Sequence, residues 1–275
     1  MAQTSGCLNQ RSNSPCANAF ESLLEDDREY FRAASRIEVV DGWQVLSPGS
    51  LLPMSTMSIV EPPPGANECP PQIIAFCQKR GFESIRFYLP GPETAHRSWS
   101  ASFVRGEETA MFGNLADTEF EPLAADISVR ALQPEDDRLK QSWLDMDSAR
   151  PDGKATSGSD YVAIENAKAD AGYMENYVIT ERGTPIGSFG LSLGQPDLVR
   201  IKNLLLAKPH RGRGLGYAAI GFAAQEARRV SRRWIGAFVL TSGTARNLYE
   251  RAGLRAIGAQ TEMIAPLALL ADGDL

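Results

Sequence analysis

This sequence of 275 residues has few of the side chains on which several common catalytic and structural schemes depend. Its four cysteines include no Cys-x₂-Cys pair, and its two histidines are His96 and His210, so no zinc-binding pattern is present. Free thiols in a reducing compartment fit these spacings better than a disulfide framework. No Gly-x-Ser-x-Gly segment occurs, which argues against a serine-hydrolase nucleophile elbow.

Long apolar runs are also missing. The longest, Ile264 to Ala271, is interrupted by Pro266, whereas a membrane-spanning helix needs roughly 20 apolar residues. The first twenty residues are polar and contain no secretory signal. The apolar fraction of 43% and the charged fraction of 23% are those of a globular protein. We therefore expect a soluble, cytoplasmic protein with no membrane partner.

The formal net charge of −6 argues against general nucleic-acid binding, but the charge is unevenly distributed. Between Leu204 and Arg255 there are ten basic and two acidic residues, which makes this segment +8 and the rest of the chain −14. This concentration predicts a polyanionic ligand held at one place. Part of the Arg228–Arg233 run also fits a solvated helix face.

The chain is long enough for two domains, at roughly 100–200 residues each. We expect a flexible tail over residues 1–19, a smaller α+β domain over residues 20–122, and a second domain over residues 123–275. In the first domain the pattern predicts helices at 20–34 and 73–80, strands at 43–46 and 84–89, a proline-rich loop at 48–71 and a hairpin across Gly106.

The second domain has a different pattern, in which strands and helices alternate after residue 123. Pro134-Glu135-Asp136 is typical of a helix start, and a loop follows around residues 151–159. The remaining pattern predicts strands at 127–130, 177–180, 185–193, 199–206, 234–240 and 254–264, and helices at 161–169, 215–229 and 244–252.

A glycine-rich turn lies between the strand at 199–206 and the helix that follows it. Gly212, Gly214 and Gly216 allow successive backbone N–H groups to point into one concavity, with the positive end of a helix behind them. Arg211 and Arg213 add two full charges. The turn is therefore predicted to bind an anion.

Other readings of this turn fit less well. A Walker loop would need Lys-Ser or Lys-Thr after the glycines, and neither is there. A dinucleotide-binding turn would need an acid at the end of the next strand, which ends Val239-Leu240-Thr241. A purely structural turn would need neither three glycines nor flanking arginines.

The turn resembles the acyl-CoA-binding motif of the GNAT superfamily of N-acetyltransferases, Arg/Gln-x-x-Gly-x-Gly/Ala, through Arg211, Gly214 and Gly216. A second signature of that family resembles Ala245 to Leu254. The resemblance runs in order over about residues 125–265. More weakly, the N-terminal half resembles the degenerate GNAT-like domain that precedes the catalytic one in two-domain members.

The resemblance implies an α/β (α+β) fold with a GNAT-like mixed, mostly antiparallel sheet flanked by helices, preceded by the smaller domain. It implies acetyl-CoA or another acyl-CoA as donor substrate, and no metal. The diphosphate would bind the turn, and pantetheine would lie where the fourth and fifth strands splay apart. A backbone N–H near Leu204 or Leu205 would polarise the thioester carbonyl. The cofactor-binding residues implied are Leu204, Leu205, Leu206, Arg211, Gly212, Arg213, Gly214, Leu215, Gly216 and Ser242.

The catalytic residue implied by the second signature is Tyr249, as general acid toward the leaving thiolate. Two positions depart from the family pattern: Ser242 stands where Asn is frequent, and Lys202 where many members have an acid that acts as base through water. The general base is therefore not assigned. Other acids that remain possible are Glu175, Asp170, Asp197 and Glu262, each of which also fits an ordinary surface acid.

The function expected is acyl transfer from a pantetheine thioester to an amine, most simply that of a small molecule. Two alternatives stay open: an acyl carrier protein as donor, and a catalytically silent acyl-CoA-binding module. The acceptor and the oligomeric state have no readable motif.

Overall fold

The computed structural model describes residues 15–48, 57–96, 102–118, 120, 123–139 and 158–271. These residues divide into two compact units, each assembled from stretches that are distant in the sequence. Unit 1 draws on Met1–Tyr30, Thr109–Lys140 and Gly172–Gly258, and unit 2 on Phe31–Glu108, Gln141–Ala171 and Ala259–Leu275. The sequence analysis predicted a domain boundary between residues 122 and 123. The two units are defined by contacts in space, so they do not test a boundary along the sequence.

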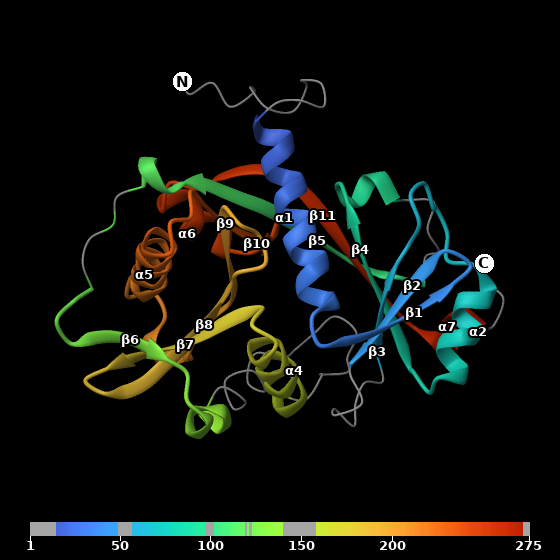
Figure 1. The fold of residues 1–275 in the computed structure, drawn as a ribbon, viewed down its shortest axis with the longest axis horizontal. Helices are drawn as coiled ribbons and strands as arrows, with labels where there is room; N and C mark the ends of the chain where they lie inside the picture. The colour runs from blue at the N-terminus through green and yellow to red at the C-terminus, as the bar shows by residue number, and fades with distance from the viewer. Residues whose placement is uncertain are drawn as a thin grey trace. The chain divides into compact units, whose positions relative to one another are not determined.

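Unit 1 is built on a mixed, mostly antiparallel sheet with the strand order β5-β10-β9-β8-β7-β6 (Figure 1). Strands β9 to β6 pair antiparallel, while β9 and β10 pair parallel. A parallel pair needs a crossover connection, which here contains helix α5. The strand bounds are β5 (Val104–Asn114), β6 (Ile127–Ala131), β7 (Met174–Glu181), β8 (Thr184–Ser192), β9 (Leu198–Leu206) and β10 (Trp234–Leu240).

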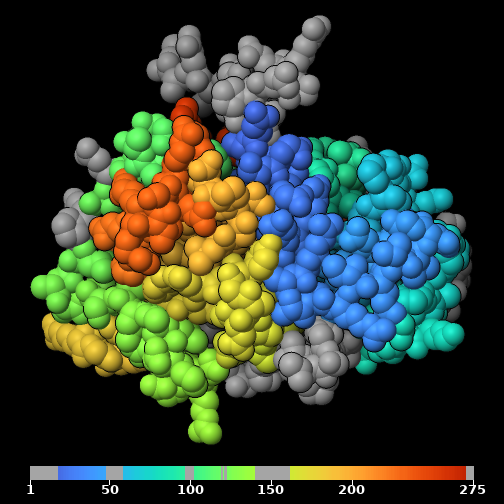
Figure 2. Space-filling model, viewed as in Figure 1, coloured from blue at the N-terminus to red at the C-terminus, as the bar shows by residue number. Residues whose placement is uncertain are grey.

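Helices cover both faces of this sheet. Helix α5 (Leu215–Arg229) packs Ile220 and Ala223 into a core cluster that also contains Ile201 of β9. Helix α1 (Pro15–Arg32) packs Leu23 against Leu198, which lies an odd number of residues from Ile201 and so faces the other side of the strand. Figure 2 shows α1, in dark blue, with its outer side at the surface. Helix α6 (Ala245–Arg251), also in this unit, follows β10.

The strands of unit 2 follow one another in the order β1-β2-β3-β4-β11. Strands β3 and β4 pair parallel, and the other neighbours pair antiparallel. Helices α2 and α7 contact each other in this unit. Cys69 and Cys77 are free and buried there, and burial raises the pKa of the Cys69 thiol to about 12. The bounds are β1 (Ser35–Val40), β2 (Trp43–Pro48), β3 (Met57–Glu61), α2 (Pro71–Lys79), β4 (Ser84–Pro90), α4 (Gly158–Asp170), β11 (Arg255–Pro266) and α7 (Leu267–Ala271).

Three local predictions are wrong. The hairpin across Gly106 is instead the single strand β5, because glycine without flanking turn residues does not by itself reverse a chain. The proline-rich loop contains β3, whose Ser58 and Val60 are buried. The expected tail ends earlier, since α1 begins at Pro15. The helix start expected at Pro134–Asp136 is present as a 3₁₀ turn that continues as α-helix over 137–139, and residues 140–157 lie outside the described part of the chain.

Candidate functional site

Strands β9 and β10 pair over only three residues and then stop. Their register joins Leu198, Val199 and Arg200 to Trp234, Ile235 and Gly236. Beyond this point, Lys202 to Leu206 are half-buried, and Leu240 is 54% exposed. The carboxyl halves of the two strands therefore leave each other's hydrogen-bonding edges open, which agrees with the predicted splay.

A bulge in β9 explains where the strands part. Asn203 has a φ of 52°, a left-handed conformation that asparagine tolerates better than most side chains. The pairing with β8 shifts register at the same place: Ser188 faces Leu205, while Gly190 faces Lys202. The extra residue increases the local twist and bend of β9. The bulge is followed by Leu204, Leu205 and Leu206, in the part of β9 that does not pair with β10.

The glycine turn follows β9, and two of its glycines have a backbone reason for their identity. Gly212 and Gly214 have φ values of 74° and 80°, and α5 begins at Leu215. The first N–H groups of an α-helix have no partner within the helix and carry its positive partial charge. The turn therefore has the positive-φ glycines and the helix start on which the anion-binding prediction rests.

Gly216 has a packing role in addition to the one expected. It lies inside α5, where a Cβ at its position would come within 2.9 Å of Leu248 Cδ2. Its missing side chain lets α6 approach the start of α5. The same approach places Leu215 and Tyr249 in one core cluster. The start of α5 and the second signature are thus brought together.

The two arginines of the turn are already engaged by the chain. Arg211 Nε donates a 2.7 Å hydrogen bond to the Leu206 carbonyl oxygen. Arg213 forms an ion pair with Glu181, and its hydrogen bonds hold the pKa of that carboxyl below its usual value. Both arginines are exposed. Much of the charge of Arg213 is therefore balanced before any ligand arrives.

Tyr249 is buried, with 5% of its surface exposed, and burial raises the pKa of its phenol. Burial is the one cause of this rise in the pKa. Ser242 lies exposed in the turn between β10 and α6. Tyr249 thus has both a packing role and a hydroxyl that stays protonated at neutral pH.

A buried ion cluster beside β9 was missed by the sequence analysis. Arg200 is fully buried and pairs with Asp26 and Asp27 of α1, at 2.5 Å and 2.7 Å. Lys202 Nζ lies 3.3 Å from Asp27 Oδ1. Where the resemblance implied an acid, β9 has Lys202. The carboxylate that pairs with Lys202 is that of Asp27, in α1. Adjacent aspartates in α1 and the Arg-x-Lys spacing in β9 were the available signals.

The other acids considered as bases have separate surroundings. Glu175 accepts a 2.5 Å hydrogen bond from the Tyr177 hydroxyl. Glu262, in unit 2, pairs with Arg86 at 3.0 Å. Asp170 and Asp197 are exposed. None of the four lies on β9 or β10.

The arginine run after α5 serves the chain's own backbone. Arg228 donates to the carbonyl oxygens of Leu115 and Thr118, at 2.6 Å and 2.5 Å. Arg229 pairs with Glu226, and Arg232 donates to the Pro196 carbonyl. These contacts give the run a structural role in addition to its charge.

Residues 140–254 match the model of the acetyltransferase (GNAT) family. A comparison with curated proteins gives no match. Among the described residues, no helix has the length and apolar composition needed to cross a membrane.

Several solved structures share this fold at low sequence identity. A tandem GNAT protein from the clavulanic acid biosynthesis pathway is 12% identical, with 94% of this chain and 90% of that chain covered and a TM-score of 0.58. A GCN5-related N-acetyltransferase from Kribbella flavida is 13% identical, with 91% and 95% covered and a TM-score of 0.54. An acetyltransferase of the family from Novosphingobium aromaticivorans is 19% identical, with 90% and 96% covered and a TM-score of 0.54.

Proposed function

Residues 140–254 match the acetyltransferase (GNAT) family, and a tandem GNAT protein shares the fold. We propose that the chain is a two-domain member of this family that transfers an acyl group from acyl-CoA to an amine. The observation that carries this proposal is the parting of β9 and β10 directly before a glycine turn that starts a helix. Open strand edges can hydrogen-bond an extended pantetheine, and the helix start can bind its diphosphate.

The donor would be held by backbone groups more than by side chains. The N–H groups of the Arg211–Gly216 turn would bind the diphosphate, with Arg211 at its rim. The N–H of Leu204 or Leu205, on the half of β9 that β10 does not cover, would polarise the thioester carbonyl. Leu206 and Ser242 would flank pantetheine from the two strand ends. Arg213 would contribute less, because Glu181 balances its charge.

Tyr249 would protonate the departing thiolate. A general acid must carry its proton when the reaction begins, and burial keeps the phenol of Tyr249 protonated. Its position in the core cluster with Leu215 supports a place near the start of α5. The acceptor amine must lose a proton to water or to a group not assigned, since Asp27 is occupied by two cations.

The donor is proposed to be free acyl-CoA, with acetyl-CoA the simplest. A carrier-bound donor would need a positive docking surface, and several arginines of the basic segment are instead used within the chain. A silent binding module is the remaining alternative, and the lysine at position 202 favours it over an enzyme with an acidic base.

Unit 2 is proposed to derive from a second, degenerate domain of the same kind. Its parallel strands β3 and β4 are joined through α2, as β9 and β10 are joined through α5. The connection into α2 contains prolines at 62–64 and 70–71, which lack N–H donors, where unit 1 has its glycine turn. Unit 2 would therefore carry no donor site.

The test is a thiol-release assay on the full chain with acetyl-CoA, a loaded carrier protein and a panel of amines. Thiol released from acetyl-CoA only when an amine is present supports the proposal. Thiol release only with the loaded carrier protein would mean that the donor is the carrier and not free acetyl-CoA. Tight binding of acetyl-CoA without thiol release for any amine would favour the silent module.

A further inference from the structure

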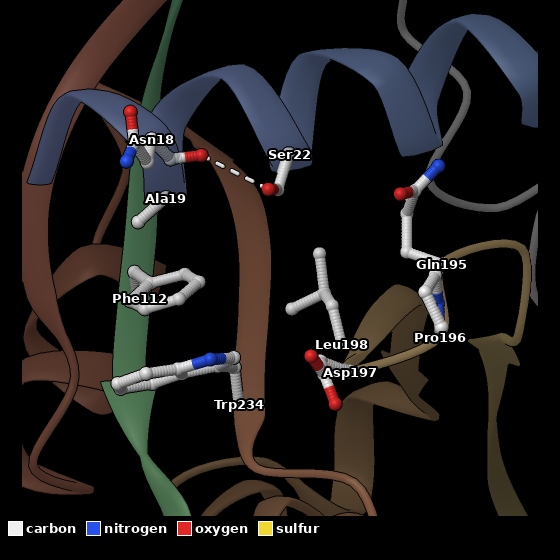
Figure 3. A pocket seen from close by; sticks show the side chains of 9 residues that line it. All are labelled: Asn18, Ala19, Ser22, Phe112, Gln195, Pro196, Asp197, Leu198 and Trp234. Atoms are coloured by element: carbon white, nitrogen blue, oxygen red, sulfur yellow. Dashed lines mark hydrogen bonds between the residues drawn. The ribbon is translucent and has the colours of Figure 1, made fainter. Parts of the chain in front are cut away.

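A hollow of about 330 Å³ lies in unit 1 at the end of the sheet where β9 and β10 begin (Figure 3). Helix α1 forms one side of it through Ala19 and Ser22, and β5 contributes Phe112. Leu198 and Trp234, the first residues of β9 and β10, line the other side. This volume falls within the roughly 300–1,000 Å³ of small-molecule sites.

The hollow is separate from the proposed donor site. It adjoins Leu198, at the start of β9, whereas the glycine turn follows Leu206, at the end of the same strand. A strand rises about 3.3 Å per residue, so these two points lie roughly 25 Å apart. A ligand in the hollow therefore does not occupy the diphosphate site.

The lining is largely apolar and aromatic. The rings of Phe112 and Trp234 have centroids 5.1 Å apart and planes tilted by 30°. Leu198 is 2% exposed and packs in the same cluster as these rings. Figure 3 shows the two rings on one side of the hollow and the Leu198 side chain rising beside them. Such walls suit the flat body of an aromatic ligand.

Among the described residues that line the hollow, Asp197 carries the only formal charge. Within the part of the chain that the structure describes, no hydrogen bond or ion pair engages its carboxylate. Its backbone is held in place, because its carbonyl oxygen accepts hydrogen bonds from Arg233 N and Trp234 N, both at 3.0 Å, while its side chain is exposed. An unpaired carboxylate beside apolar walls selects a cationic group.

Two arginines are close to the hollow but do not line it. Arg232 donates to the Pro196 carbonyl oxygen, and the Arg233 guanidinium lies 5.5 Å from the centre of the Trp234 ring. Both groups are thus held by their own contacts. They hold the loop before β9 and the first residue of β10 in place.

We propose that this hollow binds a primary arylalkyl amine, with the ammonium on Asp197 and the aromatic ring against Phe112, Trp234 and Leu198. The proposal is independent of the acyl-transfer function, because it rests on a different end of the sheet.

The test is a titration of the full, ¹⁵N-labelled chain with 2-phenylethylamine, read from the indole N–H signals. The chain has four tryptophans, and the Trp234 signal is assigned by its loss in Trp234→Phe. We expect 2-phenylethylamine to shift the Trp234 signal without shifting that of Trp43. The neutral probe 2-phenylethanol should bind about tenfold more weakly, because it lacks the positive charge that pairs with Asp197.

Two variants separate charge from shape. Asp197→Asn should weaken amine binding about tenfold and leave 2-phenylethanol unchanged, while Ala19→Leu should remove binding of both probes by filling the hollow. Asp126→Asn is the matched control, because Asp126 is another aspartate of unit 1, beside Arg182 and away from the hollow. It should bind both probes as the unaltered chain does.

Three outcomes would overturn the proposal. The first is a Trp234 signal that does not move with the amine. The second is equal amine affinity in Asp197→Asn and Asp126→Asn. The third is unchanged binding in Ala19→Leu, which would place the amine elsewhere.

Discussion

Asp26 and Arg200 form an ion pair in which neither side chain is exposed, with Asp26 Oδ2 2.5 Å from Arg200 Nε. Burial by itself lowers the pKa of Arg200. The carboxylates of Asp27 and Asp26 raise this pKa by more than burial lowers it, so the guanidinium is charged. Ser192 also donates to Asp26, at 2.9 Å. These contacts join the N-terminal helix to the strand from which the proposed donor site begins.

Removing one partner of this pair should be strongly destabilising. Asp26→Asn keeps the shape of the side chain and leaves Arg200 with one buried carboxylate partner. We expect a loss of about 3–5 kcal/mol in the free energy of unfolding, measured by urea denaturation. Glu25→Gln is the control: its ion pair with Arg28 is 42% and 41% exposed, and its loss should change stability by less than about 1 kcal/mol. Equal effects of both changes would contradict this account of α1.

The C-terminal half alone should not fold. A fragment of residues 123–275 lacks α1 and β5, and so leaves Arg200 without Asp26 and Asp27, and Leu198 without Leu23 and Ala110. We expect poor solubility or a collapsed ¹H–¹⁵N spectrum, compared with a control chain that begins at Pro15. A soluble fragment with dispersed signals and full activity would show that the division along the sequence is correct and that α1 is dispensable.

The hydroxyl of Tyr249 should matter more for turnover than for donor binding. Tyr249→Phe keeps the buried ring and removes the proton donor. We expect kcat to fall about 10- to 1000-fold, the range of general-acid contributions, with CoA affinity nearly unchanged. Steady-state kinetics and calorimetric CoA titration measure the two effects separately. Unchanged turnover under conditions in which chemistry limits the rate would leave Tyr249 with a packing role alone.

The pH dependence of turnover tests the same residue independently. A general acid acts in its protonated form, so its activity is lost as pH rises through its pKa. Burial raises the pKa of Tyr249 above its ordinary value of 10.0. We therefore expect no descending limb of kcat due to this residue between pH 7 and pH 10. A limb in that interval that disappears in Tyr249→Phe would mean that the phenol ionises more easily than its burial implies.

The sequence predicted the strands and helices of 174–258 well, because their signals are local. Alternating apolar residues, the glycines at 212 and 214, and the register of the second signature each act within a few residues. The splay of β9 and β10 was implied by family resemblance, and Asn203 supplies its local cause.

Contacts over long sequence separations could not be predicted. The adjacent aspartates of α1 are a weak signal and do not indicate that Asp26 faces Arg200, because adjacent acids in a helix are usually solvated. Gly216 shows the same limit: its close neighbour, Leu248, belongs to another helix. The strand at Met57–Glu61 was hidden by the prolines around it, although its own residues alternate in burial.

The central claim is that the backbone of the glycine turn binds the donor, and CoA titration of Gly214→Asp tests it most directly. Gly172→Asp is the matched control, since both glycines have positive φ, 75° and 80°, and neither has an atom within 4 Å of an added Cβ. Both variants should therefore be strained to a similar degree. We predict that Gly172→Asp binds CoA like the unaltered chain, while Gly214→Asp loses at least about 100-fold, as expected for losing one or two charge-assisted hydrogen bonds. A folded Gly214→Asp protein that binds CoA with unaltered affinity would contradict the claim.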